Sequence, residues 1–149
     1  MAKFEIKDGI AIIPEGTTKI NSRTFYNIEK LRSVTIPNTI TTIGQKAISE
    51  CVGLKTVSYP TSITQDDSTI FDGCNLLNTI EFTGEGTTMT YSSTKPAPWK
   101  DAKDTITTIK FKDTVNSIGD YLCEGCTALQ TIELSSSVKT INSNAFNGC

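Results

Sequence analysis

A motif that recurs at a fixed offset along the chain constrains its fold more than any other feature of the sequence. An offset of 23 superposes Pro14 on Pro37 and Pro37 on Pro60, and it carries Leu31 onto Leu54. After one interruption, the same offset relates pairs of residues near the C-terminus, namely Val115 and Val138, Ile118 and Ile141, and Cys126 and Cys149. A fixed period of this length is typical of stacked coils that share one apolar core. Residues 1–149 are therefore predicted to form one solenoid domain of about six coils.

Each repeat divides into three short sides. The first side, L-x-x-V-x-I, occurs at residues 31–36 and 129–134, and its alternate residues are expected to point inward from a short parallel strand. The second side, I-x-x-I-G, ends on residue types that tolerate a positive φ at a corner, at Asn21, Gly44, Gly119 and Asn142. The third side, A-F-x-x-C, has room only for a turn of α- or 3₁₀-helix. This pattern indicates a leucine-rich-repeat solenoid, an α/β fold of mostly short parallel strands joined by short helical turns.

Two segments depart from the repeat. Within the first of them, residues 1–12, apolar and polar side chains alternate from Phe4 to Ile12 around Asp8-Gly9, a favoured hairpin turn, and we expect this hairpin to cap the N-terminal end of the solenoid. Between Ile80 and Ile109 the offset lengthens from 23 to 29. Residues 84–98 lack the hydrophobic period and contain Gly, Pro, Ser and Thr, so they are predicted to form an inserted loop. Such insertions often lie on the binding face of a solenoid.

The repeat resembles the BspA-type, or Treponema pallidum-type, leucine-rich repeat. The residues that carry the resemblance are Ile36-Pro37, Ile40, Ile43-Gly44, Ala47 and Cys51 in one repeat, and Val138, Ile141, Ala145-Phe146 and Cys149 in another. The resemblance covers essentially the whole chain. It implies a surface or secreted protein of a bacterium or an anaerobic protist that takes part in adhesion to host proteins and cells.

The predicted loop carries Tyr91 and is followed by Trp99, the single tryptophan of the chain. In one interpretation the loop protrudes and both aromatic side chains anchor a partner. In the other, Trp99 folds back into the core position that Ala47 occupies in an earlier coil. The second interpretation is favoured because Trp99 lies four residues before Lys103, which stands where the repeat places a cysteine.

The bulk composition narrows the class of function. A net charge of -2 gives no sign of the basic face that nucleic-acid binding requires. No apolar run reaches the roughly 18 residues of a membrane span. No signal peptide is visible at the N-terminus, which indicates a cytosolic protein or a part of a longer one. The chain contains no histidine, so the commonest general base and a common zinc ligand are both absent.

Five cysteines invite a chemical interpretation. Cys123 and Cys126 form a C-x-x-C pair, which is typical of a redox centre or of half a zinc site. Cys123, however, occupies the slot of three phenylalanines that are predicted to be nearly fully buried, Phe25, Phe71 and Phe146. Disulfides between stacked cysteines are disfavoured because parallel neighbours direct their Cβ atoms alike and the fifth cysteine has no partner. We therefore expect reduced, inward-facing thiols without a bound metal.

Asp66 and Asp67 stand where the repeat expects Ile-Gly. An unpaired buried carboxylate would cost several kcal/mol, so we expect Asp66 to turn outward in a locally rearranged third repeat. A cation site or a catalytic dyad is the alternative for this pair.

Between the inward positions, the first-side strands are expected to expose a ladder of small polar residues. In one interpretation this ladder is a solvated face that keeps the sheet soluble; in the other it is a surface that contacts a protein or a glycan. With the aromatic residue of the loop, the candidate binding residues are Thr35, Thr56, Ser58, Glu81, Tyr91, Lys110 and Glu133.

The sequence therefore predicts a protein-interaction module, of the cell-surface adhesin type that binds host or extracellular-matrix proteins. An intracellular scaffold or adaptor of the same fold is the alternative. An enzyme is not expected, since no nucleophile has a base partner, and no cofactor is implied. Within the last repeat, Val138, Ile141 and Phe146 lack a covering coil, so end-to-end association of two chains through the C-terminal coil is also predicted.

Overall fold

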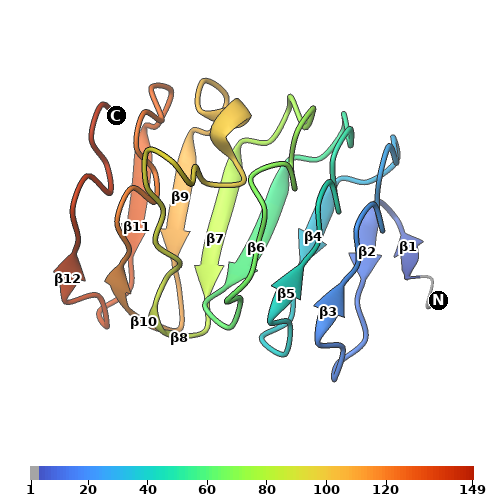
Figure 1. Cartoon of the computed structure of the whole chain (residues 1–149), viewed down its shortest axis with the longest axis horizontal. Helices are drawn as coiled ribbons and strands as arrows, with labels where there is room; N and C mark the ends of the chain where they lie inside the picture. The colour runs from blue at the N-terminus through green and yellow to red at the C-terminus, as the bar shows by residue number, and fades with distance from the viewer. Residues whose placement is uncertain (1–3) are drawn as a thin grey trace.

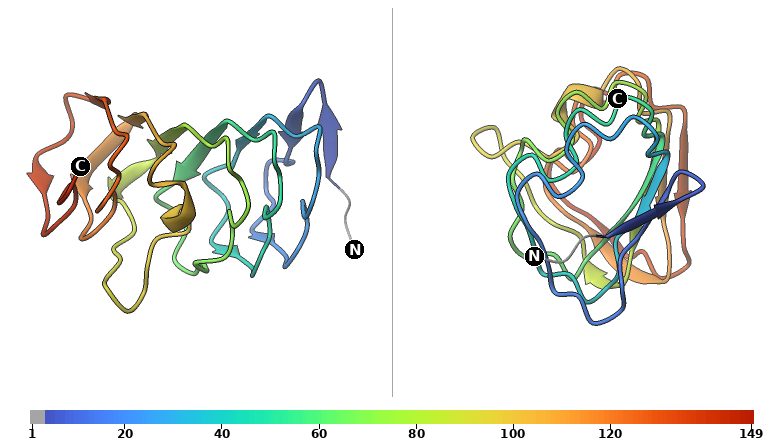
Figure 2. Two further views of the ribbon diagram at one scale, coloured as in Figure 1. Left: turned by 90° about the horizontal axis from the view of Figure 1, so that it is seen from above. Right: turned by 90° about the vertical axis from the view of Figure 1, so that its right-hand side faces the viewer.

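The computed structural model describes residues 4–149, so residues 1–3 of the predicted cap lie outside the described part. The chain winds into a solenoid whose coils lie side by side (Figure 1), and a view along the solenoid shows them superposed around one core (Figure 2). One wall is a seven-stranded sheet of order β1-β2-β4-β6-β7-β9-β11. Its strands are β1 Glu5–Lys7, β2 Ile10–Ile12, β4 Ser33–Thr35, β6 Thr56–Pro60, β7 Thr79–Thr83, β9 Thr108–Phe111 and β11 Thr131–Leu134.

The register of this sheet shows the repeat directly. Thr56 pairs with Thr79 at the regular offset, and Thr79 pairs with Thr108 across the lengthened repeat. These threonines point outward. The residue that follows in β6 and in β7, Val57 and Ile80 respectively, is fully buried, as the alternation along a strand predicts. The predicted solenoid of short parallel strands is therefore confirmed.

The N-terminal strand closes one end of the sheet. β1 pairs antiparallel with β2 through a turn in which Asp8 and Gly9 have φ values of 52° and 79°, the combination that a type I′ hairpin requires. β2 in turn pairs parallel with β4 and so belongs to the first coil. The ring of Phe4 stacks on Phe25 with centroids 5.7 Å apart, so the hairpin covers apolar surface of the first coil.

The second wall is divided into two separate sheets. One contains β3 Lys19–Ile20 and β5 Thr42–Ile43; the other, in the order β12-β10-β8, contains β8 Glu85–Thr87, β10 Thr114–Ile118 and β12 Thr140–Ile141. Residues 61–66 lie between these two sheets. They join the two-stranded sheet by a single bridge, from Gln65 to Thr42 of β5. The ladder of this wall is thus interrupted between the third and fourth coils, and Figure 1 shows its two parts along the lower edge of the molecule.

The third side consists of tight turns and one 3₁₀-helix, η1 Lys100–Ala102. Gly44 and Gly119 do not have the positive φ that the sequence pattern predicts for them. They are glycines because a Cβ atom at Gly44 would lie 2.6 Å from the backbone nitrogen of Ser22, and one at Gly119 would lie 2.3 Å from the carbonyl oxygen of Met89. Adjacent coils therefore approach too closely here for a side chain. Positive φ values occur two residues further on, at Arg23, Lys46, Tyr121 and Asn144.

The core runs the length of the solenoid. Phe25 and Phe71 occupy their shared slot and are 1% and 2% exposed, as predicted. Phe146 is only partly buried, because no coil follows it in the described chain. Near the middle of the core, the rings of Tyr59, Phe82 and Trp99 pack edge to face with centroids 5.3 to 6.4 Å apart. Such aromatic pairs add about 0.5–1.5 kcal/mol each to the burial of their area.

The inserted segment is shorter than residues 84–98. β8 pairs with β10, and the backbone nitrogen of Tyr91 donates to the carbonyl of Asp120 at 2.8 Å, so the chain follows the regular coil as far as residue 91. Only then does it leave the coil, in a turn closed by the bond from the nitrogen of Ser92 to the carbonyl of Lys95 at 3.0 Å. Ala97 is already buried again. The excess residues therefore lie between Tyr91 and Trp99.

The C-terminal end of the solenoid is open in the described chain. β11 is the last strand of its sheet and pairs only with β9 there. Its inward residues Ile132 and Leu134 are 42% and 52% exposed, and Ile141 of β12 is 55% exposed. In earlier coils the equivalent side chains are covered by the next coil.

Candidate interaction face

The outer face of the seven-stranded sheet carries two rows of side chains that run along the solenoid. Every second residue of a strand points outward, and parallel pairing stacks these residues about 4.8 Å apart. The first row, which we call the hydroxyl row, contains Ile10, Ser33, Thr56, Thr79, Thr108 and Thr131. The second, which we call the charged row, contains Thr35, Ser58, Glu81, Lys110 and Glu133. The two rows together are the sheet face.

Charges of opposite sign alternate along the charged row. The ammonium of Lys110 lies 4.0 Å from a carboxylate oxygen of Glu81 and 3.8 Å from one of Glu133. Lys112 adds a second ammonium 3.6 Å from Glu81. Ion pairs at a surface contribute only about 0–1 kcal/mol each, so this row matters less for stability than for the pattern of charge it presents.

The structure brings together all of the predicted binding residues except Tyr91. Thr35 and Glu133 are exposed, while Glu81 and Lys110 are half-buried, and all four lie in the charged row. Ser58 lies in the same row but is only 9% exposed, because its hydroxyl lies 3.4 Å from the carboxylate of the neighbouring Glu81. The sixth residue, Thr56, is half-buried in the hydroxyl row.

Two exposed apolar residues that sequence reasoning missed extend the sheet face at its N-terminal edge. Ile10 and Ile12 of β2 are 48% and 43% exposed. Ile10 pairs with Ser33 and so begins the hydroxyl row. The regular offset would have found it, since the offset carries residue 10 onto residue 33. Thus the sheet face has an apolar edge, a hydroxyl-rich centre and a charged C-terminal part.

Tyr91 belongs to the core and not to a contact loop, which corrects its assignment as a binding anchor. It is 4% exposed, and its ring packs edge to face on Trp99 with centroids 5.5 Å apart. Trp99 is 1% exposed, and its indole nitrogen donates to the carbonyl of Leu122 at 2.8 Å. This bond supplies the acceptor that a fully desolvated indole N–H needs. The burial of the side chain confirms the core interpretation of Trp99.

Asp66 points inward, contrary to prediction. Its side chain is 1% exposed, and one carboxylate oxygen accepts hydrogen bonds from the hydroxyls of Tyr59 at 2.7 Å and Tyr91 at 2.6 Å. The ammonium of Lys95 lies 3.9 Å from the other oxygen. The prediction assumed an unpaired carboxylate, whereas two phenol donors and a nearby cation compensate for the lost hydration. Burial raises the pKa of both Tyr59 and Tyr91, and the adjacent Asp66 charge raises it further.

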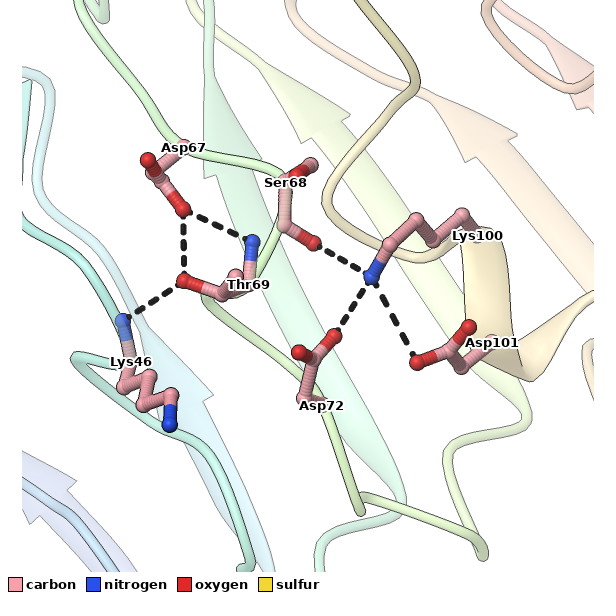
Figure 3. A network of polar contacts seen from close by, with 7 residues as sticks. All are labelled: Lys46, Asp67, Ser68, Thr69, Asp72, Lys100 and Asp101. Carbon is pink, nitrogen blue, oxygen red and sulfur yellow. Dashed lines mark hydrogen bonds and ion pairs between the residues drawn. The ribbon is translucent and has the colours of Figure 1, made fainter.

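Asp67 and its neighbours form a structural network on the third side (Figure 3). The carboxylate of Asp67 accepts from the backbone nitrogen of Thr69 at 2.9 Å and from its hydroxyl, and the hydroxyl bond lowers the pKa of Asp67. Lys100 bridges the third and fourth coils by donating to the carbonyl of Ser68 at 2.9 Å and to Asp72 at 2.6 Å. These acidic groups are thus engaged in holding turns and adjacent coils together.

The five cysteines are free thiols, and all but one of them lie in the apolar core. Cys51, Cys74, Cys123 and Cys126 are buried, and Cys149 is exposed. Burial raises the pKa of the Cys123 thiol, while the hydrogen bond with Cys123 lowers the pKa of Cys126. Both side chains are at most 1% exposed, which opposes the access that redox exchange needs. In residues 4–149, no three side chains of the metal-ligating types cluster as a site for a metal ion. No helix in the same residues has the length and apolar character to cross a membrane.

The stacked parallel strands and the repeated apolar slots define a leucine-rich-repeat protein. The family model described as the BspA type leucine rich repeat region matches six copies over residues 8–95 and 101–149. Because these ranges include most of the chain, the protein belongs to this family. The boundary at residues 96–100 coincides with the end of the inserted turn and the start of η1.

Solved structures of bacterial proteins share the fold. A leucine-rich repeat protein from Eubacterium ventriosum is 24% identical with a TM-score of 0.62, and the match covers 91% of this chain and 35% of that one. A leucine-rich repeat protein from Bacteroides ovatus is 20% identical with a TM-score of 0.53, and the match covers 93% of this chain and 40% of that one. The chain thus spans well under half the length of these relatives. A search of curated proteins gives no match.

Proposed function

We propose that this chain is a protein-interaction module that binds its partner through the sheet face. The observation that carries this proposal is the continuous pair of rows, since an ordered ladder of hydroxyl and charged groups on a rigid sheet can recognise an extended complementary surface. The exposed side chains of Ile10 and Ile12 add apolar surface that a partner would bury on binding, which the polar rows alone do not offer.

We further propose that the partner is a host or extracellular-matrix protein, as expected of a cell-surface adhesin. Membership of the BspA-type family supports this assignment, as the resemblance described above implies adhesion. An intracellular scaffold of the same fold is the second candidate, and it would use the same sheet face. The two candidates therefore differ in the partner that is bound: a host or matrix protein for the adhesin, and an intracellular protein for the scaffold.

A binding role is proposed in preference to catalysis or nucleic-acid recognition. The sequence has no histidine and a net charge of -2. One oxygen of the buried Asp66 carboxylate accepts hydrogen bonds from two phenols, and the C-x-x-C thiols lie in the core. These groups are accounted for by the fold.

Two copies of the chain are also proposed to associate end to end through the C-terminal coil. The exposed apolar side chains of Ile132, Leu134 and Ile141 lie at this end, beside the unpaired edge of β11. An exposed strand edge with apolar neighbours favours pairing with a second chain.

Binding to purified extracellular-matrix proteins immobilised on a biosensor tests the adhesin assignment. The double variant Thr79→Arg/Thr108→Arg places two bulky side chains in the middle of the hydroxyl row and should weaken binding at least about tenfold, or 1.4 kcal/mol. Thr127→Arg, at an exposed position outside the sheet face, is the matched control and should bind normally. Equal binding by the double variant would contradict the sheet face, and binding to no matrix protein would contradict the adhesin assignment.

A further inference from the structure

The interruption of the second wall leaves a strand edge unpaired inside the solenoid. β8 pairs with β10 on one side, but no backbone hydrogen bond joins it to residues 61–66 on the other, within the part of the chain that the structure describes. The two segments are tied by a side chain, since the hydroxyl of Thr61 donates to the carbonyl of Glu85 at 2.7 Å. Elsewhere in this wall, as between β3 and β5, neighbouring coils pair directly.

A groove opens at this interruption. Its cavity volume is about 680 Å³, and its lining comes from the second to the fifth coils: Asn38, Thr61, Ser62, Gly84, Glu85, Asp113 and Thr114. This volume falls within the range of about 300–1,000 Å³ that is usual for ligand sites. Gly84 keeps the groove open, because its φ is +93° and a Cβ atom there would lie 2.5 Å from the hydroxyl oxygen of Thr61.

The groove is negatively charged. Glu85 and Asp113 contribute two carboxylates, and none of the seven lining residues is a Lys or Arg. Asp113 accepts one hydrogen bond from the backbone nitrogen of Gly84 at 3.0 Å. Over residues 4–149, neither carboxylate lies within ion-pair distance of a cation. The nearby Lys112 directs its ammonium to Glu81 on the sheet face, so the charge of the groove is uncompensated.

We propose that this groove binds an extended segment of a protein partner that carries Lys or Arg side chains. The segment would lie along the groove, across the start of β8, where Glu85 belongs to the lining. Its cationic side chains would meet Glu85 and Asp113, where charge-assisted hydrogen bonds are roughly twice as strong as neutral ones. The proposal rests on the protein-interaction function, to which it adds a second surface and the chemistry of the bound segment.

A neutral glycan fits the groove less well. The hydroxyls of Thr61 and Ser62 already donate to carbonyls at 2.7 Å, to Glu85 and Ile40 respectively. No aromatic ring lines the groove on which a sugar could stack. A sugar would also leave both carboxylates without a counter-charge.

The test is an NMR titration of the ¹⁵N-labelled chain with the acetylated and amidated peptide Lys-Thr-Arg-Thr-Lys. The backbone amides of Ser62, Glu85 and Thr114 should shift in a saturable manner. The double variant Glu85→Gln/Asp113→Asn should raise the Kd at least tenfold, and its fold should persist because asparagine tolerates the φ of 54° at position 113. Asn38→Arg, which places a guanidinium at the exposed rim, should have the same effect on the Kd.

Asp104→Asn is the matched control, because it removes a carboxylate from an exposed position outside the groove and should leave the Kd unchanged. The proposal would be overturned by equal affinity for a peptide with Asn in place of the Lys and Arg residues. It would also be overturned if a neutral tetrasaccharide, and not the peptide, shifted the groove amides. If the chain binds matrix protein but not the peptide, only the groove proposal is rejected. If the peptide binds in the groove but Thr79→Arg/Thr108→Arg leaves matrix binding unchanged, only the role of the sheet face is rejected.

Discussion

Two neighbouring aspartates have opposite environments. Asp67 caps a turn near the surface, while Asp66 places its carboxylate in the core between two phenol hydroxyls. Tyr59 comes from β6 of the same coil and Tyr91 from the next coil, so the carboxylate joins the two coils. A buried polar cluster of this kind is stable only while each member keeps its partners.

The tyrosines of this cluster should make the fold sensitive to alkaline pH. Their pKa values are raised above the ordinary value of 10.0, first by burial. Their contribution to stability is therefore complete well below pH 10 and is lost as the pH rises through and beyond that value, because the phenols then ionise more readily in the unfolded chain than in the folded one. Unfolding in urea should show the free energy of unfolding falling between about pH 9 and pH 11.5.

The variant Tyr59→Phe/Tyr91→Phe provides the comparison. It should be less stable at pH 7 by about 1–3 kcal/mol per lost donor, because Asp66 stays buried with fewer partners. Its stability should fall less between about pH 9 and pH 11.5, since two of the four tyrosines are removed. Parallel pH profiles for the variant and the parent chain would show that these phenols do not titrate with unfolding.

Among the elements, those of the fourth coil combine a regular strand with an exposed turn. β8 occupies the second wall and has the parallel partner β10, whereas Ser93, Thr94 and Lys95 are exposed at the tip of the insertion. Behind the tip, Ala97 and Trp99 return to the core. The tolerance of length changes that is usual for surface loops therefore applies only to the tip, and not to the whole of 84–98.

Two matched insertions should separate these parts. Gly-Ser-Gly-Ser placed between Ser93 and Thr94 should cost no more than about 1 kcal/mol in the free energy of unfolding, because a longer surface turn adds little closure entropy. The same four residues between Gly86 and Thr87 should cost more than about 3 kcal/mol, because they break the ladder with β10 and move Tyr91 away from Asp66. Thermal and urea unfolding measure both. Equal costs at the two places would mean that β8 does not contribute to the fold.

In the molecule as a whole, the two ends of the solenoid differ. The antiparallel strand β1 covers the N-terminal coil, and Phe4 packs on Phe25 beneath it. At the other end, Ile132, Leu134 and Ile141 keep roughly half of their surface in the solvent. Terminal coils without a polar cover favour association.

Sedimentation velocity over a range up to tens of micromolar should show a mass that rises with concentration. Leu134→Lys should keep the chain monomeric, because it places a charge on the apolar end. Leu76→Lys is the matched control: Leu76 and Leu134 are both 52% exposed, but Leu76 lies in a turn before β7, in the middle of the solenoid. A monomer at every concentration, or equal behaviour of the two variants, would reject association through the C-terminal coil.

The repeat in the sequence is sufficient to predict the coil and the direction of its side chains. The offset, lengthened once between Ile80 and Ile109, predicts the row from Thr35 to Glu133 and the buried slot of Phe25, because parallel pairing carries each residue onto its equivalent in the next coil. It does not predict which outward residues are covered, so the burial of Ser58 beneath Glu81 was missed. Whether an outward residue is covered depends on the size and direction of the side chain at the equivalent position of the next coil.

Where the period fails, the outcome depends on contacts that only the folded chain makes. The hydrogen bond between Asp66 and Tyr91 spans 25 residues, and the groove gathers side chains from residue 38 to residue 114. The hydrogen bond does not follow from the repeat, because the insertion after Tyr91 breaks the offset on which the sequence argument depends. The groove residues do hold equivalent positions in successive coils, but the repeat does not predict that the surface is hollowed there. The inward turn of Asp66 required two phenols and a lysine to meet at one carboxylate, and the three-dimensional path of the fourth coil is what brings them together.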